Sequence, residues 1–400
     1  MRTVAIIGGG ASGMMAALTA AENRDNRVII FERQQRVGKK LLSTGNGRCN
    51  ITNDGCDAYT SERQRRFAEG IIDSFPARAS MEYFETLGLK TVSEYGGRVY
   101  PYSNSANSVL DVLRFALDGA GVEIKTACPV RRIERRKRGF DIVTDEERVF
   151  ADSVIVACGG MAGGKVGGVK DGYELLKSLG HTCTKLYPSL VQLITDAEVP
   201  RALKGVRCQA AVAVHSADGG TLQRAEGELQ FTDRGVSGTV IFDVSRAASV
   251  YGIGGDVTIG FGLTMTEYRE YIENRMRALP ELEASELFTG LLHNRLGRVI
   301  VKLSGVDAAK RIRGLTENEI ARLVDACWIK LKIKGTEGFD NAQVTAGGIS
   351  TDEFDPVTLE SRIVPGLYAC GEVLDVDFPC GGHNLKWAWA SGRTAGRLGR

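Results

Sequence analysis

A glycine-rich turn near the N-terminus constrains the fold of this chain more than any other feature of its sequence. Gly8, Gly10 and Gly13 satisfy the spacing G-x-G-x-x-G. An apolar run at 3–7 precedes the turn and predicts a strand, and small residues at 11–23 follow it and predict a helix. A strand, a glycine turn and a helix in this order are typical of a fold that holds a dinucleotide.

Each glycine has a physical role in such a fold. Gly8 allows the tight turn, Gly10 lets the backbone approach a pyrophosphate, and Gly13 lets the helix pack close to the strand. The helix N-terminus, with Ala11 and Ser12, supplies unpaired amides and a partial positive charge. We therefore expect phosphate oxygens to bind at this end of the helix.

An acidic residue ends the next apolar run. The run at 27–32 predicts a second strand and closes on Glu32, which lies 19 residues after Gly13. A carboxylate there accepts hydrogen bonds from the adenosine ribose and disfavours the 2′-phosphate of NADP. The alternative, a glycine turn followed by an incidental acid, does not explain the strand, turn, helix and strand order.

The segment after this acid favours FAD over NAD. Arg33 is followed by a basic, glycine-bearing loop at 37–50. A longer cofactor must extend beyond the edge of the domain. Lysines and backbone amides of this loop can neutralise the negative charge of its phosphates. The predicted cofactor contacts in this segment are Arg33, Lys39, Lys40, Gly45 and Gly47.

A second binding segment is predicted near the C-terminus. A buried strand at 366–370 closes on Gly371 and Glu372, and Gly382 precedes the C-terminal helix. A strand end with an acid, followed by a helix N-terminus, suits the ribityl chain and pyrimidine ring of a flavin, and the helix dipole would stabilise the anionic reduced form. Gly159, which follows another predicted strand, joins this cofactor set.

The sequence pattern changes in the middle of the chain. Residues 190–262 contain short alternating β segments, which predict a small barrel. Capping boxes at Thr264 and Thr316 then predict helices. We predict an α/β fold with a discontinuous Rossmann-type FAD-binding domain carrying an inserted small β-barrel and a helical subdomain. The expected bounds are 1–190 and 336–400 for the FAD-binding domain, 191–263 and 329–335 for the barrel, and 264–328 for the helices.

Bulk composition limits the partners of the chain. Its 51 Lys and Arg nearly balance 49 Asp and Glu, so no whole-molecule field favours nucleic acid or membrane. Nine scattered cysteines and a strand directly after Met1 predict a reduced, cytoplasmic protein. No apolar run approaches the roughly 20 residues that cross a bilayer. We expect a small-molecule substrate, no membrane partner and no metal.

Several runs of sequence resemble the BaiN-like (YhiN-type) family of FAD-dependent oxidoreductases. These runs are 8–13, 45–53, 231–238, 343–348 and 371–377. The resemblance spans both ends and most of the middle, and it implies the same three-part architecture with bound FAD. It implies cofactor contacts by the residues at Ser12, Glu32, Arg33, Lys40, Gly47, Val130, Glu372, Asn384 and Leu385.

Two loops depart from that family. The loop at 164–173 lacks two hydroxyl residues of the family pattern, and 378–383 reads Phe-Pro-Cys-Gly-Gly-His where many relatives have Gly-Pro-Thr-Gly-Gly-Tyr. We expect both loops to border the flavin. The departures therefore allow a different substrate or activity.

No motif identifies the catalytic group, because a flavin needs only a partner that moves a proton. His383 is a candidate acid or an ordinary neighbour of a helix cap, and Cys380 is a redox thiol or a small apolar filler. Arg98 and Tyr100 either bind an anionic or carbonyl substrate or belong to a surface turn.

Cys49 and Cys56 invite comparison with flavoprotein disulfide reductases. Their spacing differs from C-x4-C, and the chain has no second dinucleotide fingerprint for NADPH. The sequence therefore argues against a catalytic disulfide.

The leading hypothesis is an FAD-binding oxidoreductase that passes electrons between a non-covalent flavin and a small molecule, with NAD(P)H as a transient donor. One alternative is a non-enzymatic flavin-binding sensor or partner-binding protein. Another is an FAD-dependent tRNA-modifying enzyme, for which the basic run at 131–138 is the supporting feature. Alternation of apolar residues in that run favours a solvated hairpin over an RNA contact.

Overall fold

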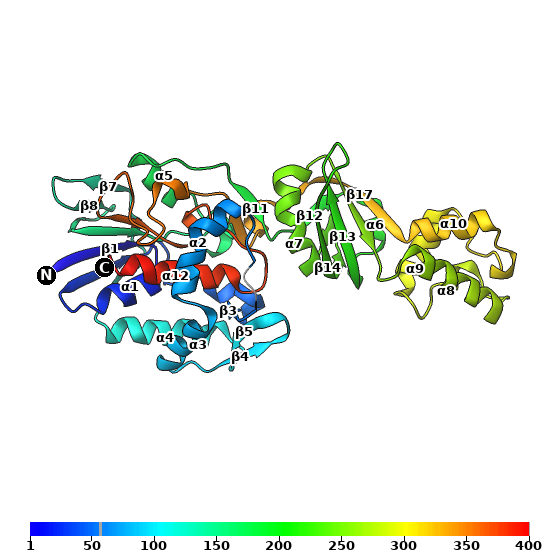
Figure 1. Cartoon of the computed structure of the whole chain (residues 1–400), viewed down its shortest axis with the longest axis horizontal. Coiled ribbons are helices and arrows are strands. Elements are labelled where there is room, and N and C mark those ends of the chain that lie inside the picture. The colour runs from blue at the N-terminus through cyan, green and yellow to red at the C-terminus, as the bar shows by residue number, and fades with distance from the viewer. Residues whose placement is uncertain (56–57, 400) are drawn as a thin grey trace. The chain divides into compact units, whose positions relative to one another are not determined.

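The computed structural model describes residues 1–55 and 58–399, and the chain divides into two compact units (Figure 1). The first unit contains residues 1–187 and the chain from 339 onward, and the second contains 188–338. The predicted α/β fold class, with a closed barrel and helices inserted into a Rossmann-type fold, is confirmed. The finer division into three parts stays a prediction.

A five-stranded parallel sheet organises the first unit. Its central strand β1 is buried from Val4 onward, as expected for a strand inside an α/β unit. Because all five strands are parallel, their carboxyl ends lie at one edge of the sheet, which is where such folds bind ligands. The strand order is β19 (Leu367–Ala369), β10 (Ser153–Val156), β1 (Arg2–Ile7), β2 (Asn26–Phe31) and β6 (Glu123–Lys125).

Helices and smaller sheets complete this unit. A three-stranded antiparallel sheet contains β3 (Thr52–Asn53), β5 (Arg98–Pro101) and β4 (Thr91–Glu94), and another contains β7 (Arg132–Arg135), β8 (Phe140–Val143) and β9 (Arg148–Ala151). The helices are α1 (Ala11–Ala21), α2 (Glu62–Ser74), α3 (Ala77–Thr86), α4 (Ala106–Gly119), α5 (Asp171–Ser178) and α12 (His383–Gly396). The shorter elements β11 (Tyr187–Ser189), α11 (Gly338–Asn341) and β18 (Val344–Ala346) lie near the two chain crossings between units.

The first and last helices, α1 and α12, lie side by side (Figure 1). A Cβ atom at Gly392 would lie 2.4 Å from the backbone oxygen of Ser12, and one at Gly396 would lie 2.6 Å from that of Ala16. Only glycine allows the two backbones to approach so closely. This contact fixes the C-terminal helix against the helix that follows the glycine turn.

The second unit is a closed barrel with helices. Its apolar core continues from the barrel into the helices, where the Tyr268 ring lies 5.6 Å from that of Trp328. The capping boxes predicted at Thr264 and Thr316 are confirmed. The barrel order is β12 (Leu193–Thr195), β15 (Gly235–Ser237), β14 (Thr221–Phe231), β13 (Arg207–His215), β16 (Asp256–Gly260) and β17 (Trp328–Thr336). The helices are α6 (Glu198–Ala202), α7 (Thr239–Ala247), α8 (Met265–Ala278), α9 (Asn294–Ser304) and α10 (Glu317–Ala326).

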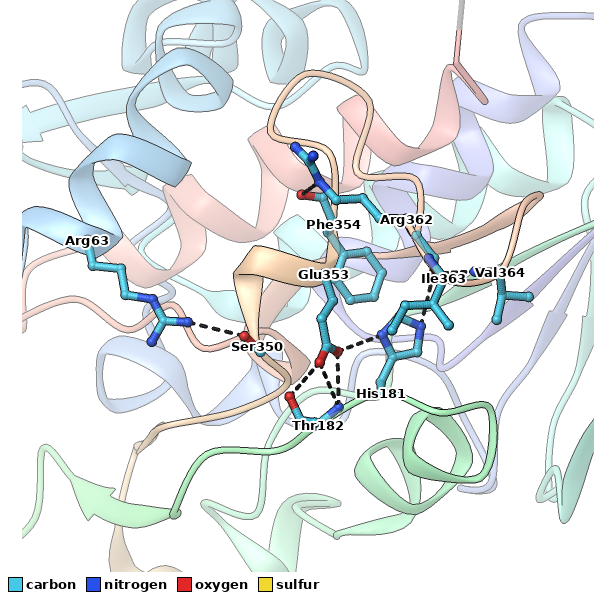
Figure 2. A network of polar contacts seen from close by, with 10 residues as sticks. Arg63, His181, Thr182, Ser350, Glu353, Phe354, Arg362, Ile363 and Val364 are labelled. Carbon is cyan, nitrogen blue, oxygen red and sulfur yellow. Dashed lines mark hydrogen bonds and ion pairs between the residues drawn. The ribbon is translucent and has the colours of Figure 1, made fainter.

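A buried histidine joins distant segments of the first unit (Figure 2). His181 Nδ1 lies 2.9 Å from Glu353 Oε2, and its Nε2 lies 3.0 Å from Ser361 Oγ. Ser361 Oγ accepts the backbone amides of Ile363 and Val364, so its own hydrogen is directed to Nε2. Nδ1 therefore carries the imidazole proton and donates it to Glu353.

The same environment keeps His181 neutral. Its ring stacks on that of Phe354 at 4.7 Å, and burial lowers its pKa, although the Glu353 carboxylate opposes that shift. Burial also raises the pKa of Glu353, but hydrogen bonds from Thr182 and His181 outweigh it and the net direction is downward. The pair is thus a neutral imidazole that donates to a carboxylate.

Among the described residues, no helix is both long enough and apolar enough to cross a bilayer.

The contact between α1 and α12 predicts a selective effect of added methyl groups. We expect Gly392→Ala to lower the free energy of unfolding by about 1–3 kcal/mol, because a Cβ there overlaps backbone. Gly70→Ala is the matched control, since a Cβ at this exposed position in α2 meets no atom within 4 Å and improves helix propensity by about 1 kcal/mol. Equal stability of the two variants in urea unfolding would contradict the packing described.

The His181 network predicts a pH-dependent stability. Because the pKa of His181 is lower in the folded than in the unfolded chain, the unfolded chain binds the proton more readily. The free energy of unfolding should therefore fall as the pH drops from 7.5 through about 6.5, the ordinary histidine value.

The variant His181→Gln separates this group from other titrations. We expect it to lower stability at pH 7.5 by about 1–3 kcal/mol through lost buried hydrogen bonds, and to flatten the pH dependence between 7.5 and 5.5. A His181→Gln slope equal to that of the parent in urea unfolding would exclude this role.

Candidate cofactor and active site

Of the three glycines that satisfy G-x-G-x-x-G, Gly8 and Gly13 are required by the conformation and packing of the protein itself, and Gly10 is not. Gly8 has a φ of +105°, and a Cβ at Gly13 would lie 1.9 Å from the Gly8 carbonyl oxygen. A Cβ at Gly10, in contrast, would meet no described atom within 4 Å. The open space beside Gly10 fits the close approach of a pyrophosphate, which is the role predicted for it.

The N-terminus of α1 faces this space without a side-chain cap. Gly10 is the N-cap residue, and the first turn carries no acidic residue. The first amides of a helix have no partner within the helix, and together with its dipole they attract an anion. Ala11 and Ser12 thus stand where a phosphate would bind, and Ser12 is buried.

Glu32 holds the turn in shape from the end of β2. Its Oε2 accepts the amide of Gly9 at 2.8 Å, and its Oε1 accepts that of Gln34 at 2.7 Å. The residue is only 9% exposed, so these bonds fix the carboxylate. Each oxygen keeps a further lone pair, which suits the ribose hydroxyls predicted to bind there.

Lys40 joins the loop at 37–50 to the second binding segment. Its Nζ lies 2.7 Å from Glu372 Oε2, and Glu372 Oε1 accepts the amide of Thr345 at 2.8 Å. A Cβ at Gly371 would lie 2.4 Å from Ser12 Oγ. The structure therefore brings the two predicted binding segments together, although they lie at opposite ends of the chain.

The remaining predicted contacts have varied surroundings. Lys39 Nζ donates to Gln34 Oε1 at 3.3 Å, and Arg33 lies 3.3 Å from Asp171. Gly45, Gly47 and Gly159 have φ values of 56°, 86° and 70°. Val130 is buried just before β7, and Leu385 packs partly buried against the core.

The side chain of Asn384 forms hydrogen bonds with the backbone of the turn that precedes α12. Its Oδ1 accepts the amide of Phe378 at 3.0 Å, and its Nδ2 donates to the carbonyl of Phe378 at 2.8 Å. These bonds shape the turn before α12. A contact between Asn384 and the cofactor stays a prediction.

Two buried acceptors beside this turn were missed by the sequence reasoning. Asn50 Oδ1 and Thr52 Oγ1 have no hydrogen-bond partner among the described residues. A Cβ at Gly382 would lie 2.8 Å from Asn50 Oδ1, and Asn53 Nδ2 donates to the Gly381 carbonyl at 2.7 Å. An unpaired buried polar group is costly, so the arrangement fits a ligand that supplies hydrogen bonds here. Both residues lie in the run 45–53 on which the family resemblance rests, but no spacing rule singles them out.

The four candidate catalytic residues gather around the same place. Arg98 and Tyr100 belong to strand β5 and not to a surface turn, and Tyr100 is 8% exposed. A Cβ at Gly45 would lie 3.3 Å from Tyr100 Cε1. His383 is the buried first residue of α12, and a Cβ at Gly381 would lie 3.6 Å from its Cδ2.

Burial and nearby charged groups both affect the pKa of Tyr100. Burial raises the pKa of its phenol, the charges of Arg98 and Arg48 oppose that shift, and Glu94 and Cys380 add to it. The turn that carries Cys380 is held near this strand by the hydrogen bond from Asn53, in the paired strand β3, to the Gly381 carbonyl.

The cysteine pair considered from the sequence gains no support. Cys49 is buried, and burial raises its pKa to about 12, which opposes formation of a reactive thiolate. Cys56 lies outside the described residues. No group of three His, Cys, Asp or Glu side chains suited to a metal occurs in the described part of the chain.

The fold and this geometry define a Rossmann-type dinucleotide-binding protein. Residues 2–398 match the profile of the family described as HI0933-like protein Rossmann domain, and the chain belongs to that family. The predicted BaiN-like (YhiN-type) family is thereby confirmed.

Two characterised relatives span the chain. It is 40% identical to the 3-dehydro-bile acid delta(4,6)-reductase of Clostridium scindens, over 99% of this chain and 98% of that protein. It is 27% identical to the ribosomal RNA dihydrouridine synthase of Escherichia coli, over 96% and 95%. The predicted enzyme class, an FAD-dependent oxidoreductase, is confirmed.

Among solved structures, the 3-ketosteroid delta1-dehydrogenase of Sterolibacterium denitrificans is similar with a TM-score of 0.49 and 13% identity, covering 99% of both chains.

The open space beside Gly10 predicts a variant that loses cofactor without losing the fold. We expect Gly10→Ala to keep the thermal stability of the cofactor-free protein, because its Cβ meets no protein atom and its backbone is extended. Binding of FAD should weaken by at least about tenfold, since the methyl group occupies the pyrophosphate position.

Titration of FAD by fluorescence quenching measures this effect. Gly70→Ala, distant in sequence and equally free of clashes, should bind FAD like the parent protein. Unchanged FAD affinity in Gly10→Ala would place the pyrophosphate elsewhere.

Proposed function

We propose that this chain, with FAD bound, reduces a carbon–carbon double bond conjugated to a carbonyl group in a small molecule. The observation that carries the proposal is 40% identity, over nearly the whole chain, to a reductase whose name specifies a 3-oxo compound with double bonds at positions 4 and 6. The second relative saturates the uridine ring, whose double bond is also conjugated to a carbonyl. The two relatives share a type of bond although their substrates differ.

Reduced FAD, when bound, supplies a hydride for the carbon farther from the carbonyl. The residues of this chain must then bind the carbonyl oxygen and deliver a proton to the neighbouring carbon. Arg98 offers positive charge for the oxygen as it becomes enolate-like. The amides at the start of α12, after Gly381 and Gly382, offer a second source of partial positive charge.

NAD(P)H is proposed as the electron donor. The chain carries one dinucleotide fingerprint, and that fingerprint is assigned to FAD, so a nicotinamide donor would dock transiently. Glu32 disfavours the 2′-phosphate of NADPH only at the site that is assigned to FAD, and it does not act on a donor that docks elsewhere. Either NADH or NADPH is therefore compatible with the proposal.

The basic run at 131–138 supports an RNA substrate less well than its composition suggests. Arg131 lies 2.6 Å from Asp145, Arg132 lies 3.2 Å from Glu134, and Arg136 pairs with Asp141. Acids of the same small sheet thus offset these charges, as expected for a solvated hairpin. Reduction of RNA would be recognised in the test below, because uridine-containing RNA would then reoxidise the flavin.

The proposal predicts a sequence of spectral changes. The protein reconstituted with FAD should absorb near roughly 450 nm and bleach when NADH or NADPH is added without oxygen. A 4,6-dien-3-one steroid should restore the colour, because it accepts the hydride. The saturated 3-ketone with the same skeleton is the control and should not restore it.

Two results would contradict this function. One is a flavin that no unsaturated carbonyl compound reoxidises, and the other is reoxidation by uridine-containing RNA alone.

A further inference from the structure

Reduction of a conjugated double bond needs a proton as well as a hydride. The π bond between the two carbons breaks, a hydride forms a C–H bond at one carbon, and a proton forms a C–H bond at the carbon next to the carbonyl. FAD in its reduced form, if bound here, would supply both electrons as the hydride. The proton must come from an acid close to the flavin end of the cofactor.

Tyr100 has the position that this acid needs. It lies on β5, beside Gly45 of the predicted cofactor loop, and Asn53 of the paired strand β3 donates a hydrogen bond to Gly381 in the turn before α12. The turn before α12 is predicted to border the flavin, and the loop that contains Gly45 is predicted to contact the same cofactor. We propose that Tyr100 donates this proton and that Arg48 positions it, an inference that rests on the proposed function.

Arg48 holds the phenol ring by its face. The guanidinium carbon lies 3.9 Å from the centre of the Tyr100 ring, within the range of a cation–π contact. Arg48 is itself held by hydrogen bonds to Glu94 and Asn104. The contact uses the ring face, so the hydroxyl group at the ring edge stays available to donate.

The surrounding charges suit a residue that gives up a proton and takes it back from solvent. Burial raises the pKa of the Tyr100 phenol, which keeps it protonated at neutral pH. The charges of Arg98 and Arg48 lower the pKa of the phenol and so favour the phenolate that remains after transfer, although the Glu94 carboxylate opposes them. Tyr100 is therefore an acid in its resting state, and its conjugate base has two positive neighbours, Arg98 and Arg48, and one negative neighbour, Glu94.

The experiment uses full-length holoprotein, with NADPH and a 4,6-dien-3-one steroid as probes. Tyr100→Phe removes only the hydroxyl group, so FAD binding and bleaching by NADPH should stay within about twofold of the parent. Reoxidation by the dienone should slow by about 10²–10⁴-fold, the usual contribution of a general acid. Tyr102 is 70% exposed, and the variant Tyr102→Phe should reoxidise at the parental rate.

A second variant tests the positioning role of Arg48. Because the Arg48 charge lowers the pKa of Tyr100, Arg48→Met should move the alkaline limb of the reoxidation rate to higher pH. A purely structural role for Arg48 would lower the rate without moving this limb.

The outcomes separate the two proposals. Reoxidation of Tyr100→Phe within threefold of the parent, while the parent reduces the dienone, would overturn the assignment of Tyr100 alone. Failure of the parent to reduce any unsaturated carbonyl compound would overturn the proposed function and this inference together.

Discussion

The close contact between α1 and α12 is the constraint on which the rest of the structure depends. Gly392 and Gly396 let the last helix lie against the backbone of the first, where any larger residue would overlap Ser12 or Ala16. This contact holds Gly371 against Ser12 and sets the turn before α12 beside the loop at 37–50. Two segments from opposite ends of the chain thereby meet at the predicted cofactor site. The burial of helix surface provides the driving force, and glycine provides the geometry.

Charge within this site is fixed by hydrogen bonds before any ligand arrives. Glu32 is held by two backbone amides, and Glu372 is held by one amide and by Lys40. Such fixed groups need little reorganisation when a cofactor binds. The unsatisfied Asn50 Oδ1 is the exception, and it lies beside Gly382 at the end assigned to the flavin. The chemistry is thus assigned to the end of the cofactor farthest from the glycine turn.

Local sequence patterns predict much of this architecture. Features that depend on contacts between distant segments could not be predicted from the sequence. The strand, turn, helix and strand at 3–32 and the capping boxes at Thr264 and Thr316 were readable because each depends on residues close in sequence. The role of Glu32 in holding Gly9, the orphaned Asn50 oxygen and the partners of His181 were not readable. Those depend on which distant segments meet, and no periodicity records that. Tyr100 was a candidate from its residue type alone, and only the fold placed it beside Gly45.

A crystal structure of the protein with FAD bound tests the central claim most directly. We expect the pyrophosphate to lie at the N-terminus of α1 beside Gly10 and the ribose to bind Glu32. The isoalloxazine ring should lie at the start of α12, where it contacts Asn50 and Tyr100. A cofactor bound with its isoalloxazine ring away from Asn50 and Tyr100 would contradict the account, because the residues proposed to move charge and protons would then lie too far from the reacting atoms.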